Sequence, residues 1–266
     1  MISAKIIEDS IAGNDCRLTT LELKYPRFIH SEVMTHRVFS RNAASSRAIP
    51  IKKVIDQVIN NPAKPIHWGT NKPGMQAGEE LPGFTLERAQ ILWATAALKA
   101  AELAQRLSDL NLHKQVVNRI LEPFQIMTTI VSATDWDNFF ELRISPLAQP
   151  EIRDLAEKIQ FAMDESKPKY RTSYHLPFIT EYERDNFKID VLRNVSAARC
   201  ARVSYLNHDG SSPDIKKDQV LANSLMQNKH ASPFEHVARP LLSSDKSPSM
   251  CRNFDGWIQY RAEIGL

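Results

Sequence analysis

The segment of residues 35–50 places the strongest constraint on how this chain can fold. Its sequence, T-H-R-V-F-S-R-N-A-A-S-S-R-A-I-P, holds Arg37, Arg41 and Arg47 among hydroxyl, amide and small side chains. Guanidinium groups offer forked donors that suit phosphate, and small residues let the backbone approach a ligand closely. The segment therefore predicts an anion cradle for a nucleotide. The alternative from composition alone is a solvated basic turn.

Length and charge exclude several classes of function. With 266 residues the chain can bury a sizeable core, and we expect a single domain. The formal net charge is only +3 and no block of lysine and arginine occurs, so we expect no binding to nucleic acid. Charged residues interrupt every apolar run near the start of the chain, and no run is long enough to span a bilayer. We therefore expect neither a signal peptide nor a membrane partner.

The cysteines and histidines do not form a metal-ligand pattern. Cys16, Cys200 and Cys251 are far apart and lack CxxC spacing, which predicts a cytoplasmic location and no metal site. No activating neighbour of a cysteine is visible, so a thiol nucleophile is not expected. His230 and His236 flank a segment that Pro233 keeps from forming the helix on which an i, i+4 pair would bind a metal.

Hydrophobic periodicity gives a first list of elements. Alternating apolar residues predict strands at residues 5–7 and 18–25. Residues 125–133 are rich in β-branched side chains and their type stays open, while residues 170–187 are expected to form a loop. Thr85 is expected to cap the longest helix. A helix is predicted at residues 27–37, and the cradle is expected to follow it as a loop. Further helices are predicted at residues 51–59, 85–110, 112–121, 136–144, 151–166, 189–205 and 214–228.

The segment of residues 62–83 interrupts this helical pattern. It holds four prolines and four glycines, which forbid regular structure over most of its length. A loop this long in a compact domain is usually a lid, a binding loop or a disordered segment. The segment is therefore predicted to be a long loop of one of these kinds.

Familiar nucleotide and nucleophile motifs are missing. Neither G-x-G-x-x-G nor G-x-x-x-x-G-K-[ST] occurs, and no G-x-S-x-G presents a serine. Arg119 and Arg143 fall near the ends of apolar helices, where each guanidinium needs a partner. That partner is either an acidic residue of the chain itself or a ligand phosphate or pyrimidine carbonyl.

Three blocks of the sequence resemble the flavin-dependent thymidylate synthases. The first, T-H-R-V-F-S-R-N-A-A-S-S-R, resembles the family signature R-H-R followed by a serine, asparagine and arginine loop. The second comprises N-R-I-L-E-P at residues 118–123, N-F-F-E-L-R at 138–143 and A-Q-P-E-I-R at 148–153. The third comprises S-A-A-R-C-A-R-V-S-Y at residues 196–205 and H-A-S-P-F-E-H at 230–236.

The order of the blocks differs from that of the family. In the family the third block stands before the first, whereas here it follows the second. The chain thus resembles a circular permutation of the family pattern. A permuted chain can form the same contacts when the original termini lie close together.

The resemblance implies a fold, a cofactor and a reaction. It implies an α+β fold with a mixed, largely antiparallel sheet flanked by helices, assembled as a homotetramer with active sites shared between subunits. It also implies FAD as cofactor and transfer of a one-carbon unit from methylenetetrahydrofolate to carbon 5 of dUMP, with NADPH as reductant. Such a transfer depends on orientation and charge complementarity more than on a protein nucleophile, in keeping with the lack of an activated cysteine.

The resemblance also assigns residues by position. The nucleotide-binding set it implies is Arg37, Ser45, Ser46, Arg47, Arg119 and Arg143, of which Arg37, Ser45 and Arg143 are the catalytic residues. The set implied for the flavin and folate is His36, Val38, Asn138, His230, Ser232 and Glu235.

Four positions depart from the family pattern. Thr35 replaces an arginine, Glu32 replaces a glutamine near the nucleotide, and Ser132 and Thr134 replace an asparagine and an arginine expected at the flavin. A carboxylate beside a phosphate is unfavourable, so either Glu32 points elsewhere or the bound base is not uracil. The alternatives are methylation or hydroxymethylation of another deoxypyrimidine nucleotide such as dCMP, and a non-catalytic nucleotide-binding subunit.

Overall fold

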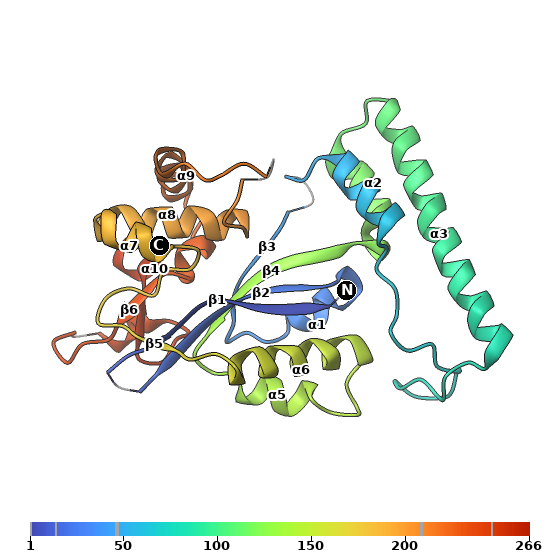
Figure 1. Cartoon of the computed structure of the whole chain (residues 1–266), viewed down its shortest axis with the longest axis horizontal. Helices are drawn as coiled ribbons and strands as arrows, with labels where there is room; N and C mark the ends of the chain where they lie inside the picture. The colour runs from blue at the N-terminus through green and yellow to red at the C-terminus, as the bar shows by residue number, and fades with distance from the viewer. Residues whose placement is uncertain (1, 14, 46–47, 208–209, 246) are drawn as a thin grey trace.

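The centre of the structure, a computed structural model that describes residues 2–13, 15–45, 48–207, 210–245 and 247–266, is a five-stranded sheet (Figure 1). Its strand order is β3-β4-β2-β1-β5, and every neighbouring pair is antiparallel except the parallel pair β1 and β5. The predicted α+β fold with a mixed, largely antiparallel sheet is therefore confirmed. The strands are β1 (Ser3–Ile11), β2 (Arg17–Pro26), β3 (Ser40–Ala43), β4 (Ile126–Ala133) and β5 (Lys169–Tyr170).

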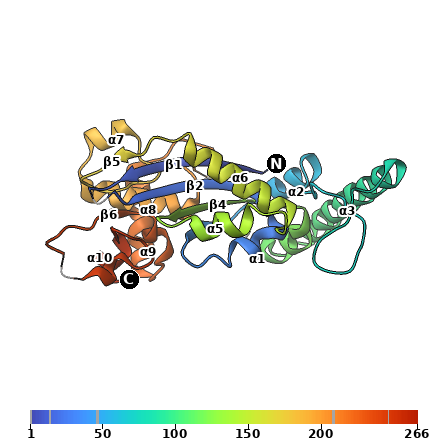
Figure 2. The same cartoon turned by 90° about the horizontal axis from the view of Figure 1, so that it is seen from below.

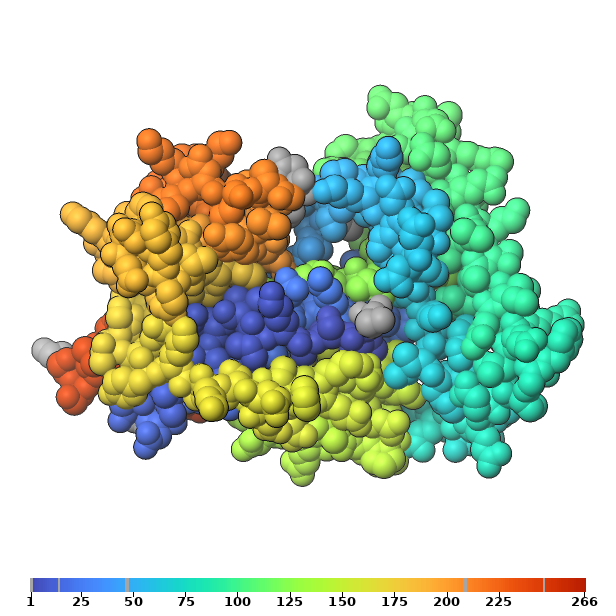
Figure 3. Space-filling view, viewed as in Figure 1, coloured from blue at the N-terminus to red at the C-terminus, as the bar shows by residue number. Residues whose placement is uncertain are grey.

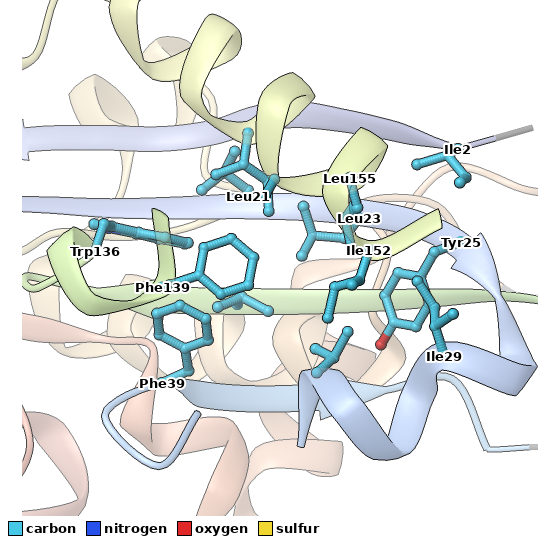
Figure 4. Packing of buried hydrophobic residues seen from close by; sticks show 14 of the residues in the cluster. Ile2, Leu21, Leu23, Tyr25, Ile29, Phe39, Trp136, Phe139, Ile152 and Leu155 are labelled. Carbon is cyan, nitrogen blue, oxygen red and sulfur yellow. The ribbon is translucent and has the colours of Figure 1, made fainter. Parts of the chain in front are cut away.

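One face of the sheet carries the main apolar core. Leu21, Leu23 and Tyr25 alternate along β2 and point to the same side, as the period of two in a strand requires. Helices α5 (Asp137–Arg143) and α6 (Pro150–Asp164) cover this side, and Ile152 and Leu155 of α6 pack on the strands (Figures 2 and 4). The apolar alternation that predicted the strand thus also fixes which face the helices bury.

The other face is covered by the C-terminal part of the chain. Helix α8 (Ile189–Arg202) packs here, with α7 (Glu181–Asn186), α9 (Ile215–Gln227) and the 3-10 turn η3 (Ser232–Glu235) beside it (Figure 1). Ile130 of β4 belongs to the same buried cluster as Cys200 and Val203. The third sequence block therefore lies directly on the sheet that the first block borders.

A separate helical group adjoins the end of the sheet (Figures 1 and 2). It comprises α2 (Ile51–Asn60), α3 (Gly83–Asp109), α4 (Lys114–Val117) and the 3-10 segment η2 (Asn118–Phe124). Residues 61–82 connect α2 to α3, and their only strand-like pairing is an isolated bridge between Gly69 and Glu80, so the predicted loop ends one residue earlier, where Gly83 starts α3. The chain closes with β6 (Ala238–Pro240), η4 (Pro248–Cys251), β7 (Trp257–Gln259) and α10 (Tyr260–Glu263).

Several predicted elements were wrong in their extent. The cradle is not a loop from the start, because residues 40–43 form β3 by pairing with β4. The helix predicted at residues 27–37 is only η1 (Arg27–Ile29) and α1 (His30–Val33). The long helix begins at Gly83 and has Pro82, not Thr85, at its N-cap. Pro82 suits this end because the first helical N–H groups have no partner within the helix.

Two further predictions were wrong for local reasons. Residues 112–121 do not form one helix ended by Pro123; α4 continues into η2, which contains that proline. Residues 170–187 are not all loop, because Thr180 and Glu183 form a capping box that starts α7. No helix in the described part of the chain is both long enough and apolar enough to cross a membrane.

Two fully buried histidines on the second face make stability depend on pH. Burial lowers the pKa of His236 from 6.5 to about 3 and lowers that of His175 well below 6.5, with Arg184 and Arg171 adding to the second effect. The unfolded chain therefore binds protons below about pH 6.5 that the folded chain does not. Stability should be complete above that pH and fall as the pH decreases, by up to about 1.4 kcal/mol per pH unit for each histidine.

Urea unfolding at a series of pH values between about 7.5 and about 5 measures this slope. His236→Gln should remove the contribution of one histidine to the slope. His230→Gln is the matched control, because His230 is exposed and its replacement removes no buried base. A wild-type stability that stays constant over this range would contradict the assignment.

Candidate active site

Arg143, at the end of α5, is the centre of a compact polar group that we call the anchor cluster. Its Nε donates to Nε2 of His36 at 2.9 Å, and its Nη2 donates to Oγ1 of Thr35 at 3.1 Å. Its Nη1 lies 3.4 Å from Oε2 of Glu32. Thr35, the departure from the family signature, and Glu32 thus both contact the arginine that the sequence assigned to the nucleotide.

His36 is held as a neutral ring in this cluster. Because its Nε2 accepts from Arg143, the ring hydrogen must be on Nδ1. Burial, followed by the positive charges of Arg143 and Arg41, lowers the pKa of His36 to about 4. The ring also packs edge-on against Phe139. His36 therefore keeps one orientation and one charge state around neutral pH.

Strand β3 delivers the next arginine of the first block. Nη1 of Arg41 donates to the backbone carbonyls of Met34 and His36, each at 2.9 Å. Burial lowers the pKa of Arg41, and the negative charge of Glu235 opposes that shift. Arg41 thus ties the turn before β3 to the strand and is electrostatically coupled to the H-A-S-P-F-E-H motif.

A second polar group, which we call the tail cluster, joins the C-terminal segment to β3. Oγ of Ser40 accepts from the amides of Asn253 and Gln259 at 3.1 and 3.2 Å. Arg261 donates to Gln259 at 2.7 Å and to Glu235 at 2.6 Å. Asn253, Gln259 and Arg261 were not predicted as site residues, because single polar residues in an irregular tail carry no periodic signal.

Direct contacts place the third sequence block beside strands β3 and β4. Nδ1 of His236 lies 2.8 Å from Oγ of Ser132 in β4. The amide of Asn42 in β3 donates to the backbone carbonyl of Cys200 at 3.3 Å. Three segments far apart in the sequence therefore meet at the β3 edge of the sheet.

The remaining assigned residues are not all brought together within one chain. Arg37, Val38, Ser45, Asn138, His230 and Ser232 are exposed. Ser46 and Arg47 lie outside the described residues. Arg119 is exposed in η2 and pairs with Glu122 at 2.6 Å, which also accepts from Arg27. Helix α5, with Asn138, and η3, with Ser232, cover opposite faces of the sheet.

A cleft of about 920 Å³ opens beside the anchor cluster. Its lining includes Glu32, Arg143, Phe28 and Trp93, together with residues 65–67 and 75–77 of the long loop. Figure 3 shows a further hollow between α2 and the helices α8 and α9, next to the residues that surround β3. The 920 Å³ cleft next to Arg143 is thus lined in part by the long loop, as expected for a binding loop.

Two of the departures from the family pattern are engaged inside the protein. Ser132 is fully buried in β4, and Oγ1 of Thr134 accepts from the backbone N–H of Asp255 at 2.9 Å. Their short side chains thus serve internal contacts at positions where the resemblance predicts flavin ligands. Among the described residues, no group of three acidic, histidine or cysteine side chains is arranged to hold a metal ion.

Burial also determines the direction in which the pKa of each of the three thiols is shifted. Cys16, Cys200 and Cys251 form no disulfide, and burial raises the pKa of each thiol above its usual value. A raised pKa lowers the fraction of reactive thiolate at neutral pH. None of these three thiols therefore has the lowered pKa of an activated cysteine nucleophile.

Comparison with known proteins yields one family match. The model of a family described as thymidylate synthase complementing protein matches residues 17–169, which is more than half of the chain and contains the first and second blocks. No curated protein matches the sequence.

The solved structures that resemble this chain are distant. A UMP/dUMP methylase, PolB from Streptomyces cacaoi, bound with 5-Br UMP has 16% identity and a TM-score of 0.49, covering 62% of this chain and 89% of that chain. The same enzyme bound with 5-Br dUMP has 15% identity, a TM-score of 0.48 and coverages of 62% and 91%. Thymidylate Synthase X from Helicobacter pylori with FAD and dUMP has 21% identity, a TM-score of 0.38 and coverages of 55% and 67%. The family match, and not these structures, therefore supports the assignment that follows.

Proposed function

The chain belongs to the family of thymidylate synthase complementing proteins, the flavin-dependent thymidylate synthases, and from that premise we propose that it transfers a one-carbon unit from methylenetetrahydrofolate to carbon 5 of dUMP. The observation that best supports the proposal is the meeting of Arg143, strand β3 and the H-A-S-P-F-E-H motif at one edge of the sheet. The reductant in the proposal is NADPH, and the compartment is the cytoplasm.

Arg143 is the residue we propose to polarise the pyrimidine. Its guanidinium is oriented by His36 and Thr35 and borders the cleft. A guanidinium fixed in this way stabilises the negative charge that develops on a pyrimidine carbonyl when carbon 5 attacks. The nucleotide is also proposed to contact Arg37, Ser45, Ser46 and Arg47 of the first block and Arg119 of the second. Arg37 and Ser45 are exposed.

FAD is the cofactor of the proposal, and its redox chemistry would pass electrons from NADPH to the transferred carbon. The residues proposed to hold it are His36, Val38, Asn138, His230, Ser232 and Glu235. The hydroxyl of Ser232, the imidazole of His230 and the amide of Asn138 are exposed, so their polar atoms are open to a ligand. Hydroxyl, imidazole and amide groups can bind the hydroxyl, phosphate and ring nitrogen groups of a dinucleotide.

A homotetramer with shared active sites is part of the proposal, and two observations support it. Arg143 lines the cleft, whereas Arg119 is exposed in η2 and pairs with Glu122, so in the proposal a neighbouring subunit brings Arg119 to the site. Helix α3 also exposes a row of large apolar side chains, which in a soluble protein marks an interaction surface. These side chains are Phe84, Ile91, Leu92, Leu98 and Leu103.

Flavin binding gives the first test of the proposed function. Purified protein should be yellow, and its flavin absorbance should remain with the protein peak during gel filtration. A colourless protein that takes up no flavin when incubated with FAD would contradict the proposal. It would instead favour a nucleotide-binding subunit without catalysis.

The contact between Glu32 and Arg143 favours a second candidate substrate. Glu32 faces the arginine and lines the cleft, so it does not point away from the proposed base site. A carboxylate can only accept hydrogen bonds, whereas the edge of uracil at carbon 4 is a carbonyl acceptor. Cytosine has an amino donor at that position. The alternative is therefore methylation or hydroxymethylation of a cytosine nucleotide such as dCMP.

Glu32→Gln is expected to shift base preference from cytosine towards uracil. The amide can donate to the carbonyl at carbon 4, which the carboxylate cannot do, and a well-placed pair of this kind discriminates by about 1 to 3 kcal/mol. The ratio of dCMP to dUMP affinity, measured by calorimetry, should fall about tenfold or more. The control is Glu141→Gln, an exposed position on α5. An unchanged ratio in the Glu32 variant would show that this side chain does not contact the base.

A further inference from the structure

Five buried polar side chains form a continuous chain of hydrogen bonds on the sheet face opposite α5 and α6. Ser10 of β1 contacts Nδ1 of His175 at 2.8 Å, and Nε2 of His175 contacts Oγ1 of Thr20 at 2.7 Å. Thr20 contacts its cross-strand partner Ser132, which contacts Nδ1 of His236 at 2.8 Å. All five residues are 0% exposed, so their hydrogen bonds are shielded from bulk solvent.

Such a chain has only two self-consistent directions. Each hydroxyl donates one hydrogen and accepts another, and each neutral imidazole has one N–H and one bare nitrogen. If His175 donates from Nδ1 to Ser10, then its Nε2 accepts from Thr20, Thr20 accepts from Ser132, and Ser132 accepts from Nδ1 of His236. In the opposite direction every donor and acceptor exchanges roles. All four hydrogen bonds within the chain form in either direction, so the groups at its two ends determine which direction is favoured.

The first end is a carboxylate. Oγ of Ser10 lies 3.4 Å from Oε1 of Glu8, which also accepts from Nη2 of Arg171 at 3.0 Å and Nη2 of Arg184 at 2.7 Å. Burial raises the pKa of Glu8, while the two guanidinium groups oppose the shift and stabilise the carboxylate. A carboxylate only accepts, so the hydroxyl of Ser10 donates to Glu8 and must accept from His175.

The second end is the free nitrogen of His236. Its Nε2 is buried and has no hydrogen-bond partner among the described residues. In the direction that ends at Glu8, this atom is a bare lone pair. In the opposite direction it is a buried N–H without an acceptor, and orphaned buried N–H groups are the rarer case in proteins. Both ends therefore favour the same direction.

We propose that Glu8 sets the direction of this chain and thereby holds His236 in its Nδ1–H tautomer. His236 is then a positioning residue. It donates to Ser132, fastens the end of the H-A-S-P-F-E-H motif to β4, and keeps an unprotonated Nε2 in the interior. The charged groups near the chain, Glu8, Arg171 and Arg184, all lie at the Ser10 end. The tautomer of His236, the last residue of the motif, thus depends on the carboxylate of Glu8 in β1, which is linked to it through Thr20 of β2 and Ser132 of β4.

Nitrogen NMR of the full-length protein labelled with ¹⁵N-histidine tests the proposal. In the wild type, Nδ1 of His236 should give the shift of a protonated ring nitrogen and Nε2 that of a bare one, with the assignment made from a His236→Gln sample. Ser10→Ala removes the link to Glu8, so the ratio of the two tautomers should move towards Nε2–H by about fivefold or more, the factor that corresponds to one hydrogen bond. Glu8→Gln should shift the ratio in the same sense, because an amide can also donate.

Thr129→Val is the matched control. Thr129 is a fully buried hydroxyl of β4 outside the chain, bonded to Tyr25, so its loss should leave the tautomer of His236 unchanged. A wild-type His236 with the hydrogen on Nε2 would overturn the proposal, whatever the Ser10 and Glu8 variants show. A tautomer that stays the same in a folded Ser10→Ala protein would overturn the role of Glu8. None of these results depends on whether the protein binds FAD.

Discussion

Arg143→Ala is expected to lower kcat/KM for one-carbon transfer by about a hundredfold to a thousandfold, the usual cost of removing one preorganised donor to a developing negative charge. The guanidinium is oriented by three hydrogen bonds, to His36, Thr35 and Glu32, and borders the cleft. Arg143→Lys should restore little of the lost kcat/KM, because one ammonium group cannot replace a planar guanidinium whose three nitrogens all form hydrogen bonds. Steady-state kinetics with dUMP would measure both variants.

Arg153→Ala provides the matched control for this experiment. Arg153 lines the same cleft, but its acidic neighbour is Glu157 on its own helix at 3.9 Å. Its removal should change kcat/KM only a few-fold, because it lacks the fixed orientation of Arg143. An equal loss in both variants would mean that the charge of the cleft, and not the geometry of Arg143, determines the rate.

Arg199→Met is expected to cost about 3 to 5 kcal/mol of unfolding free energy, the range for breaking a buried ion pair from one side. Arg199 is fully buried in α8, donates to Glu183 at 2.9 and 2.6 Å, and donates to Asp218 at 3.0 Å. A further hydrogen bond to the carbonyl of Phe178 measures 2.7 Å. Methionine keeps much of the apolar stem, but leaves two carboxylates short of their buried partner.

Urea unfolding followed by circular dichroism would measure this loss. Arg106→Ala is the control, because Arg106 is exposed on α3 and its pair with Glu102 should contribute less than about 0.5 kcal/mol. A loss below about 1 kcal/mol for Arg199→Met would show that the buried network is not a main support of the third block.

The sequence predicted the elements with a clear apolar period and missed those without one. Strand β2 and helices α2, α6 and α9 were predicted close to their observed bounds, because each has a clear apolar period in its sequence. Strand β3 was not predicted, because S-R-N-A has no apolar alternation and becomes a strand only by pairing with β4. Strand β4 is buried on both faces, so its β-branched run left its type open.

Helix α7 was missed although a local signal was present. Thr180 and Glu183 have the spacing of a capping box, which marks the start of a helix even where no apolar stripe follows. The aromatic, irregular composition of the preceding residues instead indicates a loop, so the two local signals conflict at this point of the chain.

The site was predictable in part. The structure pairs His36 with Arg143, two of the assigned residues, although more than a hundred positions separate them in the sequence. The tail cluster was not predictable, since contacts such as that between Asn253 and Ser40 join distant irregular segments by single hydrogen bonds. The role of Ser132 and His236 in a buried chain was equally hidden, because a serine in a strand looks the same whether it faces a ligand or another hydroxyl.

Release of tritium from dUMP labelled at carbon 5 is the most direct test of the central claim that these three segments form a flavin-dependent site for alkylating a pyrimidine. The account predicts that the yellow protein releases tritium only when methylenetetrahydrofolate and NADPH are both present. It also predicts that Arg143→Ala slows the release about a hundredfold or more, while Arg153→Ala slows it only a few-fold. Flavin-loaded protein that binds a pyrimidine nucleotide but releases no tritium from labelled dUMP or dCMP would contradict it.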